Sequence, residues 1–107
     1  HAARRFTGET DRKALETLYA ALVRLSPSLG ARVGQAAVSE PEQGLILLGT
    51  LPEKSVAAYQ PFHAVRADLL KRLGRTAEAA AAYARAIELS PDEEVRRFLW
   101  ARMAAAT

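Results

Sequence analysis

Cysteine is absent from this chain of 107 residues, and its imidazoles are limited to His1 and His63. Without thiols the chain has no disulfide, no thiolate zinc site and no cysteine nucleophile, which fits a reducing, cytoplasmic compartment. A nucleophile elbow, a glycine-rich phosphate loop and a metal-ligand spacing are also missing. We therefore predict that the protein is not an enzyme and takes no metal, no cofactor and no small-molecule substrate.

Long apolar runs are missing as well. The longest aliphatic stretch is Leu45 to Leu48, far short of the roughly 20 residues needed to cross a bilayer, so we expect no membrane contact. Arg4 and Arg5 are not followed by the apolar region of a signal peptide. The opening His1, in place of Met, indicates a piece of a longer protein.

Half of the residues are apolar, so the chain can bury the core of one domain. We expect residues 1–9 to be a flexible N-terminal segment or linker and residues 10–107 to form the domain. The net charge of +3, from 15 basic and 12 acidic residues, is too small to require a nucleic-acid partner but leaves one open.

Three helices are predicted in the first half from apolar periodicity. The first begins at about Asp11, ends at Ser26-Pro27, and carries one apolar face made of Leu15, Leu18, Tyr19, Leu22 and Leu25. The second covers residues 28–38, where Gly30 and Gly34 would let a neighbouring helix approach closely. The third covers residues 39–49 and turns inward Leu45, Leu47 and Leu48.

Three further helices are predicted in the second half, after a connecting loop at residues 53–59. Pro61 opens a helix that closes at Gly74, a left-handed carboxyl cap, with a stripe of Phe62, Val65, Leu69 and Leu73. Thr76 is expected to cap the next helix, whose inner face is Ala79, Ala82, Tyr83, Ala86 and Ile87. Ser90 and Glu93 predict a capping box for the last helix, with an apolar face of Val95, Phe98, Leu99 and Met103.

About six helices joined by short connections, with no alternating strand pattern, predict an all-α fold of antiparallel helix hairpins stacked side by side. The spacing of a tetratricopeptide repeat, a helix-pair repeat in which alanines admit an aromatic ring, is matched by Gly74, Ala79, Tyr83, Ala86 and Pro91. A weaker echo in the first half is formed by Tyr19, Leu25 and Pro27. We therefore expect a right-handed, tetratricopeptide-like superhelix.

Four segments carry a family resemblance: ALETLYAALVRLSPS at 14–28, EPEQGL at 40–45, HAVRADLLKRLGRTAEAAAAYARAIEL at 63–89 and RRFL at 96–99. Over residues 10–102 the chain resembles the C-terminal tetratricopeptide-like extension of one group of bacterial extracytoplasmic-function sigma factors of the sigma-70 family. The resemblance implies a regulatory domain that modulates transcription initiation by contacting sigma regions of the same protein or RNA polymerase. Promoter DNA would be contacted only through sigma regions that these residues do not contain.

Five residues are predicted to contact the partner: Arg66, Arg72, Arg75, Arg97 and Trp100. The first three crowd one hairpin end, and Trp100 lies about 140° around its helix from Val95, off the apolar stripe. Exposed aromatic side chains are favoured anchors at protein interfaces.

Other roles and functions stay open at this point. Arg66, if inward, would need a carboxylate such as Asp68 or Glu78. His63 is interpreted as a structural side chain that hydrogen-bonds a neighbouring helix or loop. The alternative functions are a nucleic-acid-binding helical module, favoured by the arginine pairs, and a stand-alone tetratricopeptide adaptor for a peptide.

Overall fold

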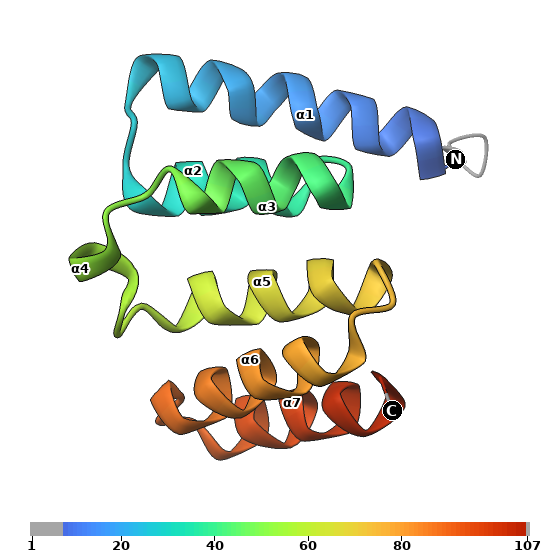
Figure 1. The fold of residues 1–107 in the computed structure, drawn as a ribbon. Helices are drawn as coiled ribbons and strands as arrows, with labels where there is room; N and C mark the ends of the chain where they lie inside the picture. Colours follow the sequence, from blue (N-terminus) through green and yellow to red (C-terminus); the bar gives the residue numbers. More distant parts are fainter. Residues whose placement is uncertain (1–7, 107) are drawn as a thin grey trace.

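A computed structural model describes residues 8–106 of the chain, with the side chains of residues 12–105. This part contains no strand and seven helices: α1 (Gly8–Leu25), α2 (Leu29–Ala37), α3 (Pro41–Gly49), α4 (Glu53–Val56), α5 (Gln60–Arg72), α6 (Thr76–Leu89) and α7 (Glu93–Ala106) (Figure 1). The prediction of an all-α fold is confirmed for these residues. Helix α1 begins three residues before the predicted start, and residues 1–7 of the predicted flexible segment lie outside the described part.

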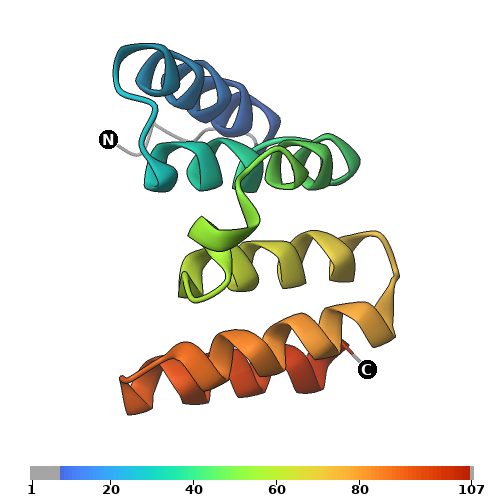
Figure 2. The same ribbon diagram turned by 60° about the vertical axis from the view of Figure 1, so that its left-hand side comes forward.

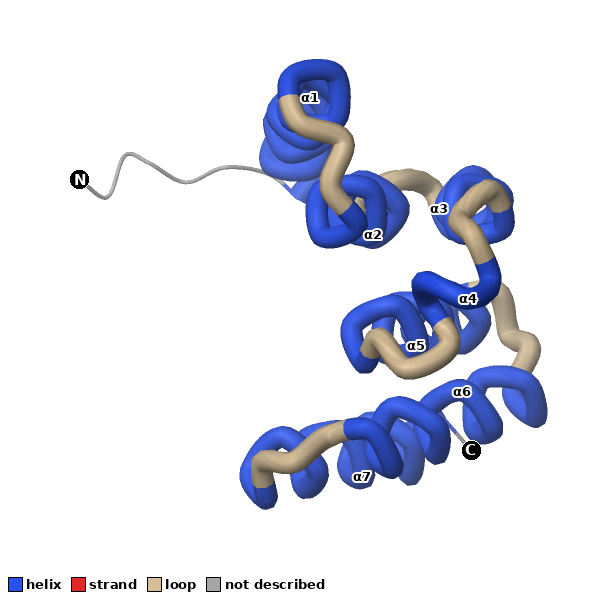
Figure 3. The backbone as a smooth tube through the Cα atoms, turned by 90° about the vertical axis from the view of Figure 1, so that its left-hand side faces the viewer, coloured by secondary structure: helices blue, strands red, loops and turns tan. Residues whose placement is uncertain are grey.

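The long helices form antiparallel neighbours stacked in chain order. Helix α2 packs between α1 and α3, and α6 packs between α5 and α7. Helix α5 joins the two groups because it also contacts α2 and α3. Figure 2 shows α1, α2 and α3 on one side of α5 and the α6–α7 pair on the other, and Figure 3 shows the same order nearly along the helix axes.

The buried core consists of two clusters. One cluster, between α2, α3, α4 and α5, contains Val33, Ala36, Leu48, Leu51, Val56 and Leu69. The other, between α5, α6 and α7, contains Ala67, Leu70, Ala79, Ala82, Tyr83, Ala86 and Leu99. The predicted inward residues of α6 are thus confirmed, apart from Ile87, which is half-buried against the second cluster.

Two of the predicted apolar faces are mostly exposed instead of buried. On α1, Tyr19 is half-buried, whereas the four leucines of its predicted face are exposed. On α7, Leu99 is buried but Val95 and Phe98 are exposed. Periodicity identified the helices correctly, but it does not tell which side of a terminal helix has a neighbour to pack against.

The carboxyl end of α5 is closed as predicted. Gly74 has φ +77°, the left-handed conformation that glycine adopts without a Cβ penalty. The Arg75 N–H donates to Leu70 O at 2.9 Å and the Gly74 N–H donates to Lys71 O at 2.9 Å, the paired bonds of a Schellman motif.

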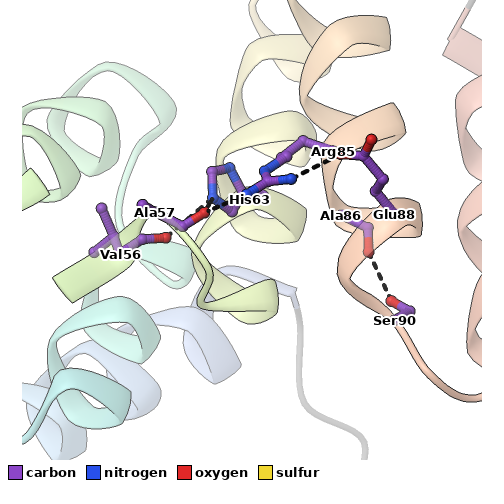
Figure 4. Close-up of polar contacts among 7 residues, drawn as sticks. All are labelled: Val56, Ala57, His63, Arg85, Ala86, Glu88 and Ser90. Carbon is purple, nitrogen blue, oxygen red and sulfur yellow. Dashed lines mark hydrogen bonds and ion pairs between the residues drawn. The ribbon is translucent and has the colours of Figure 1, made fainter. Parts of the chain in front are cut away.

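Two predicted amino-terminal caps are wrong. Arg75, not Thr76, holds the cap position of α6, and it makes no side-chain cap hydrogen bond. Asp92, not Ser90, caps α7: its Oδ1 accepts from the N–H groups of Glu94 at 2.7 Å and Val95 at 3.3 Å. Ser90 is buried and its hydroxyl donates backward to Ala86 O at 2.7 Å (Figure 4), so it finishes α6.

The segment predicted as a loop at residues 53–59 contains the one-turn helix α4, with Val56 buried. His63 Nε2 lies 3.0 Å from Val56 O and 3.1 Å from Ala57 O, which places the ring proton on that nitrogen. Arg85 of α6 donates from Nη2 to the same Ala57 O at 3.0 Å (Figure 4). The structural role predicted for His63 is confirmed, because this side chain and Arg85 hold the carboxyl end of α4 against α5 and α6.

Small residues allow the closest helix contacts. A Cβ built on Gly34 of α2 would lie 2.3 Å from the Tyr19 ring of α1, so the predicted close approach at Gly34 is confirmed. A Cβ on Gly44 of α3 would lie 2.6 Å from Ala36 O of α2. A larger residue at Gly44 would therefore push α3 away from the α2 backbone, whereas one at Gly34 would displace the Tyr19 ring.

Replacing Ala79 or Ala86 with Trp should loosen or unfold the domain, because both alanines are fully buried between helices. Overpacking of this kind typically costs about 1–3 kcal/mol, and each kcal/mol lowers the melting temperature of a 60–100-residue domain by about 4–8 °C. Ala81→Trp and Ala84→Trp on the exposed side of the same helix are matched controls. Equal melting temperatures for all four variants would show that the alanine face of α6 is not interior.

Candidate partner-binding groove

An apolar groove of about 210 Å³ runs across α5 and α7 and reaches the end of α2. It is lined by Ala37, Ala64, Val65, Asp68, Leu69, Tyr83, Phe98, Leu99 and Arg102. Helix α5 supplies two pairs of residues that lie four positions apart, Ala64 with Asp68 and Val65 with Leu69. Helix α7 supplies Leu99 and one such pair, Phe98 with Arg102, and residues four apart are neighbours on one helical face. Helix α6 packs between α5 and α7, and it contributes Tyr83 to the lining that these two helices share.

One polar pair crosses this apolar groove. The Arg102 guanidinium of α7 forms an ion pair and hydrogen bond with Asp68 Oδ1 of α5, and the Tyr83 hydroxyl lies 3.5 Å from the same oxygen. The Arg102 Cζ also lies 5.5 Å from the centre of the Phe98 ring, a cation–π distance. Asp68, Tyr83 and Arg102, from three helices, are therefore linked through one carboxylate, and Phe98 lies against the same guanidinium.

The energetic weight of the pair is modest, because its side chains remain 35% and 37% exposed. Ion pairs at such exposure contribute between about 0 and 1 kcal/mol, so the pair fixes geometry more than it stabilises the fold. The hydrogen bond with Asp68 raises the pKa of Arg102, and burial raises the pKa of the Tyr83 phenol above its usual value. At neutral pH the groove thus presents a charged guanidinium, paired with Asp68, and a neutral phenol.

The five predicted contact residues lie outside the lining of this groove. Arg66 is half-buried, and Arg72, Arg75 and Arg97 are exposed. Trp100 is 56% exposed, in agreement with its predicted position off the apolar stripe. Arg75 instead lines a separate pocket between α3 and the end of α5, together with Glu42, Leu45, Ile46 and Leu73.

The carboxylates considered for Arg66 are engaged by other arginines. Asp68 pairs with Arg102, and Glu78 pairs with Arg75 through contacts of 2.7 and 2.9 Å. The hydrogen bonds between Arg75 and Glu78 raise the pKa of Arg75 and lower the pKa of Glu78. Arg66 forms no ion pair with either carboxylate among the described residues, although its charge contributes to the lowered pKa of Glu78.

The predicted residues do not gather at one place. Arg75 directly precedes α6, whereas Arg97 lies about one turn after the start of α7, near the opposite end of α6. Fourteen residues of α6 span roughly 21 Å at 1.5 Å per residue. Arg72 and Arg75 therefore form one basic end, and Arg97 with Trp100 forms a separate patch on α7.

Sequence reasoning missed the groove although the sequence contained two useful signals. The apolar period predicts Phe98 in an inward stripe, and Asp68 is predicted as one of the carboxylates that Arg66 would need. The four-residue step from Phe98 to Arg102 allows a guanidinium to lie over an aromatic ring on one helix face. This spacing could have predicted a binding surface on α7. The contact between Arg102 and Asp68, which are 34 residues apart, depends instead on how the helices are stacked.

Among the described residues no three His, Asp or Glu side chains lie together as a metal-ligand set. None of the described helices combines the length and the apolar character needed to cross a bilayer.

The chain is similar in sequence to one segment of a longer protein. Over 94 residues it is 39% identical to an uncharacterized protein of Rhizobium meliloti (strain 1021), and the alignment covers 84% of this chain but 22% of the relative. The chain thus spans about a fifth of the length of the relative that it matches. No family model matches the chain, and no solved structure matches it significantly. The chain is therefore similar to one segment of a larger protein of unknown function.

Proposed function

We propose that this chain is a tetratricopeptide-like protein-interaction domain that regulates an RNA polymerase sigma factor. The observation that carries the interaction role is the apolar groove on α5 and α7, open to solvent and crossed by one ion pair. A surface of this kind suits a protein segment that buries apolar side chains and orients itself on a fixed charge pair.

The repeat arrangement has its own support. Ala79, Tyr83 and Ala86, which match the repeat pattern, are fully buried between α5 and α7. Each helix packs against its neighbours in the chain, and α2 also contacts α5, as in a stack of helix pairs. On this proposal the helices continue one right-handed superhelix, and the groove lies on its inner side.

The sigma-factor role rests on the sequence resemblance carried by residues 63–99. The proposed partners are sigma regions of the same protein, RNA polymerase, or both, and the proposed location is the cytoplasm, where these partners act. The relative from Rhizobium meliloti is several times longer than the chain, which is compatible with a regulatory domain attached to other regions. The domain is proposed to act by binding alone, with no catalytic step.

The nucleic-acid-binding alternative is weakened by the ion pairs. Arg75, Arg85, Arg96 and Arg102 each pair with a carboxylate, so much of the basic charge is already neutralised within the domain. The groove is mainly apolar and offers no row of cationic side chains to a phosphate backbone. The peptide-adaptor alternative uses the same groove and differs in the identity of the bound segment.

Phe98→Glu should weaken capture of the sigma regions or RNA polymerase by at least about tenfold, equivalent to 1.4 kcal/mol, because it places a charge in the apolar groove. Phe98 is exposed, so thermal melting should remain nearly unchanged. Val95→Glu is the matched control, since Val95 is an exposed apolar residue of α7 outside the groove lining. The measurement is a quantitative pull-down with purified sigma regions and polymerase. Equal capture by both variants would exclude the groove, and failure of the unaltered domain to bind either partner would contradict the proposed function.

The basic end with Arg72 and the α7 patch with Trp100 are tested separately from the groove. Arg72→Ala with Trp100→Ala should leave melting within about 0.5 kcal/mol of the unaltered domain, because both side chains are exposed. In the full-length protein we expect sigma-dependent transcription to fall, because these side chains are predicted to contact the partner. If a folded variant shows undiminished transcription, Arg72 and Trp100 do not contact the partner. The groove then stays the candidate binding site.

DNA binding gives a third discriminating measurement. We expect promoter-DNA affinity of the domain to be weak and to lack a steep dependence on salt. A protein that neutralises several phosphates loses about 10³- to 10⁵-fold in affinity between 50 and 200 mM salt. A titration that shows such a slope would favour the nucleic-acid-binding module instead.

A further inference from the structure

Helix α1 carries an apolar face that the described part of the chain leaves uncovered. Leu15, Leu18, Leu22 and Leu25, here called the leucine stripe, are 42%, 51%, 39% and 81% exposed. They follow at steps of three, four and three residues, the spacing of a seam that packs against another helix. The contact with α2 uses one edge of this face, where Tyr19, four residues from Leu15 and three from Leu22, lies against Gly34.

The α1–α2 pair recurs as the α6–α7 pair, 64 residues later. Helices α1 and α6 end at Leu25 and Leu89, and α2 and α7 begin at Leu29 and Glu93. The caps of α2 and α7 follow the same shift. Ser28 Oγ accepts from the N–H three residues ahead at 3.1 Å, and Asp92 Oδ1 accepts from the N–H three residues ahead at 3.3 Å.

This shift identifies what should cover the leucine stripe. Its first three members correspond to Ala79, Ala82 and Ala86 of α6, which are 0%, 2% and 0% exposed. Those alanines are buried in one cluster with Ala67 and Leu70 of α5, the helix that precedes α6. Among the described residues nothing stands before α1 in the place that α5 holds before α6.

We propose that in the full-length protein the leucine stripe is covered by a helix that precedes residue 1 and packs antiparallel on α1, as α5 packs on α6. The matched segment makes up 22% of the relative from Rhizobium meliloti, so proteins of this kind contain ample further chain. This inference rests on the repeat arrangement proposed above and not on the sigma-factor assignment. Leucines replace the alanines of α6, so the covering helix needs small residues where it faces them.

A second copy of the chain is a poorer occupant. The exposed parts of four leucines amount to roughly a few hundred Å², against about 800 Å² per partner in a stable interface between separate proteins. A helix of the same polypeptide loses far less translational freedom on docking, so a small apolar contact is sufficient. The surface therefore fits an intramolecular partner best.

Hydrogen exchange of the full-length protein, compared with the 107-residue chain, tests the proposal. We expect the amides of residues 15–25 to exchange at least about tenfold more slowly in the full-length protein. Leu18→Glu with Leu22→Glu should abolish this difference. Thr17→Glu with Arg24→Glu, which adds acidic charges to an exposed face of α1 away from the leucine stripe, should preserve it.

A second readout is independent of the charged variants. The chain has no cysteine, so Leu22→Cys introduces one thiol into it, whose alkylation should be fast in the 107-residue chain and slow in the full-length protein. Equal exchange and equal alkylation in the two proteins would overturn the proposal. Protection that grows with protein concentration, together with a dimeric mass in ultracentrifugation, would overturn it in favour of a second copy. Protection in a full-length protein that binds neither sigma regions nor polymerase would contradict the proposed function alone and leave this inference intact.

Discussion

The stacking of α5 between two groups of helices is the constraint on which the rest of the structure depends. Leu69 is buried in the cluster with α2, α3 and α4, and the next residue, Leu70, is buried in the cluster with α6 and α7. Consecutive helical residues point about 100° apart, so one helix can enter two cores only if it has neighbours on two sides. The rest of α5 is then free to present Ala64 and Asp68 to the groove.

The groove and the leucine stripe follow from the same arrangement. A stack of helix pairs buries the contacts between neighbours but leaves one side of each helix, and the outer face of each end helix, to other partners. The groove lies between side chains of α5 and α7 and is crossed by the Asp68–Arg102 pair. The leucine stripe is an outer face of the first helix, and its apolar character is unusual for a surface that meets water.

Local chemistry in the sequence was sufficient to predict much of the fold. Apolar periodicity located six of the seven helices, since a helical face repeats every three to four residues regardless of what covers it. Gly74 was correctly placed as a left-handed cap because few residues besides glycine adopt that conformation readily. The buried alanines of α6 were also predicted, because small residues at a regular helical step are typical of a face that packs closely on a neighbouring helix. The caps predicted at Thr76 and Ser90 are wrong, because Arg75 and Asp92, one and two residues away, hold the cap positions.

Only the tertiary structure decided which apolar faces are buried and which polar groups meet. Leu18 and Ala82 occupy equivalent repeat positions, yet one is exposed and the other buried, because α5 precedes α6 and no described helix precedes α1. The contact between Asp68 and Arg102 joins residues 34 apart, so no local pattern encodes it. The sequence by itself determined the helices and their small-residue contacts, since these depend on near neighbours in the chain. The groove and the leucine stripe depend on which helices lie side by side, a property of the whole stack.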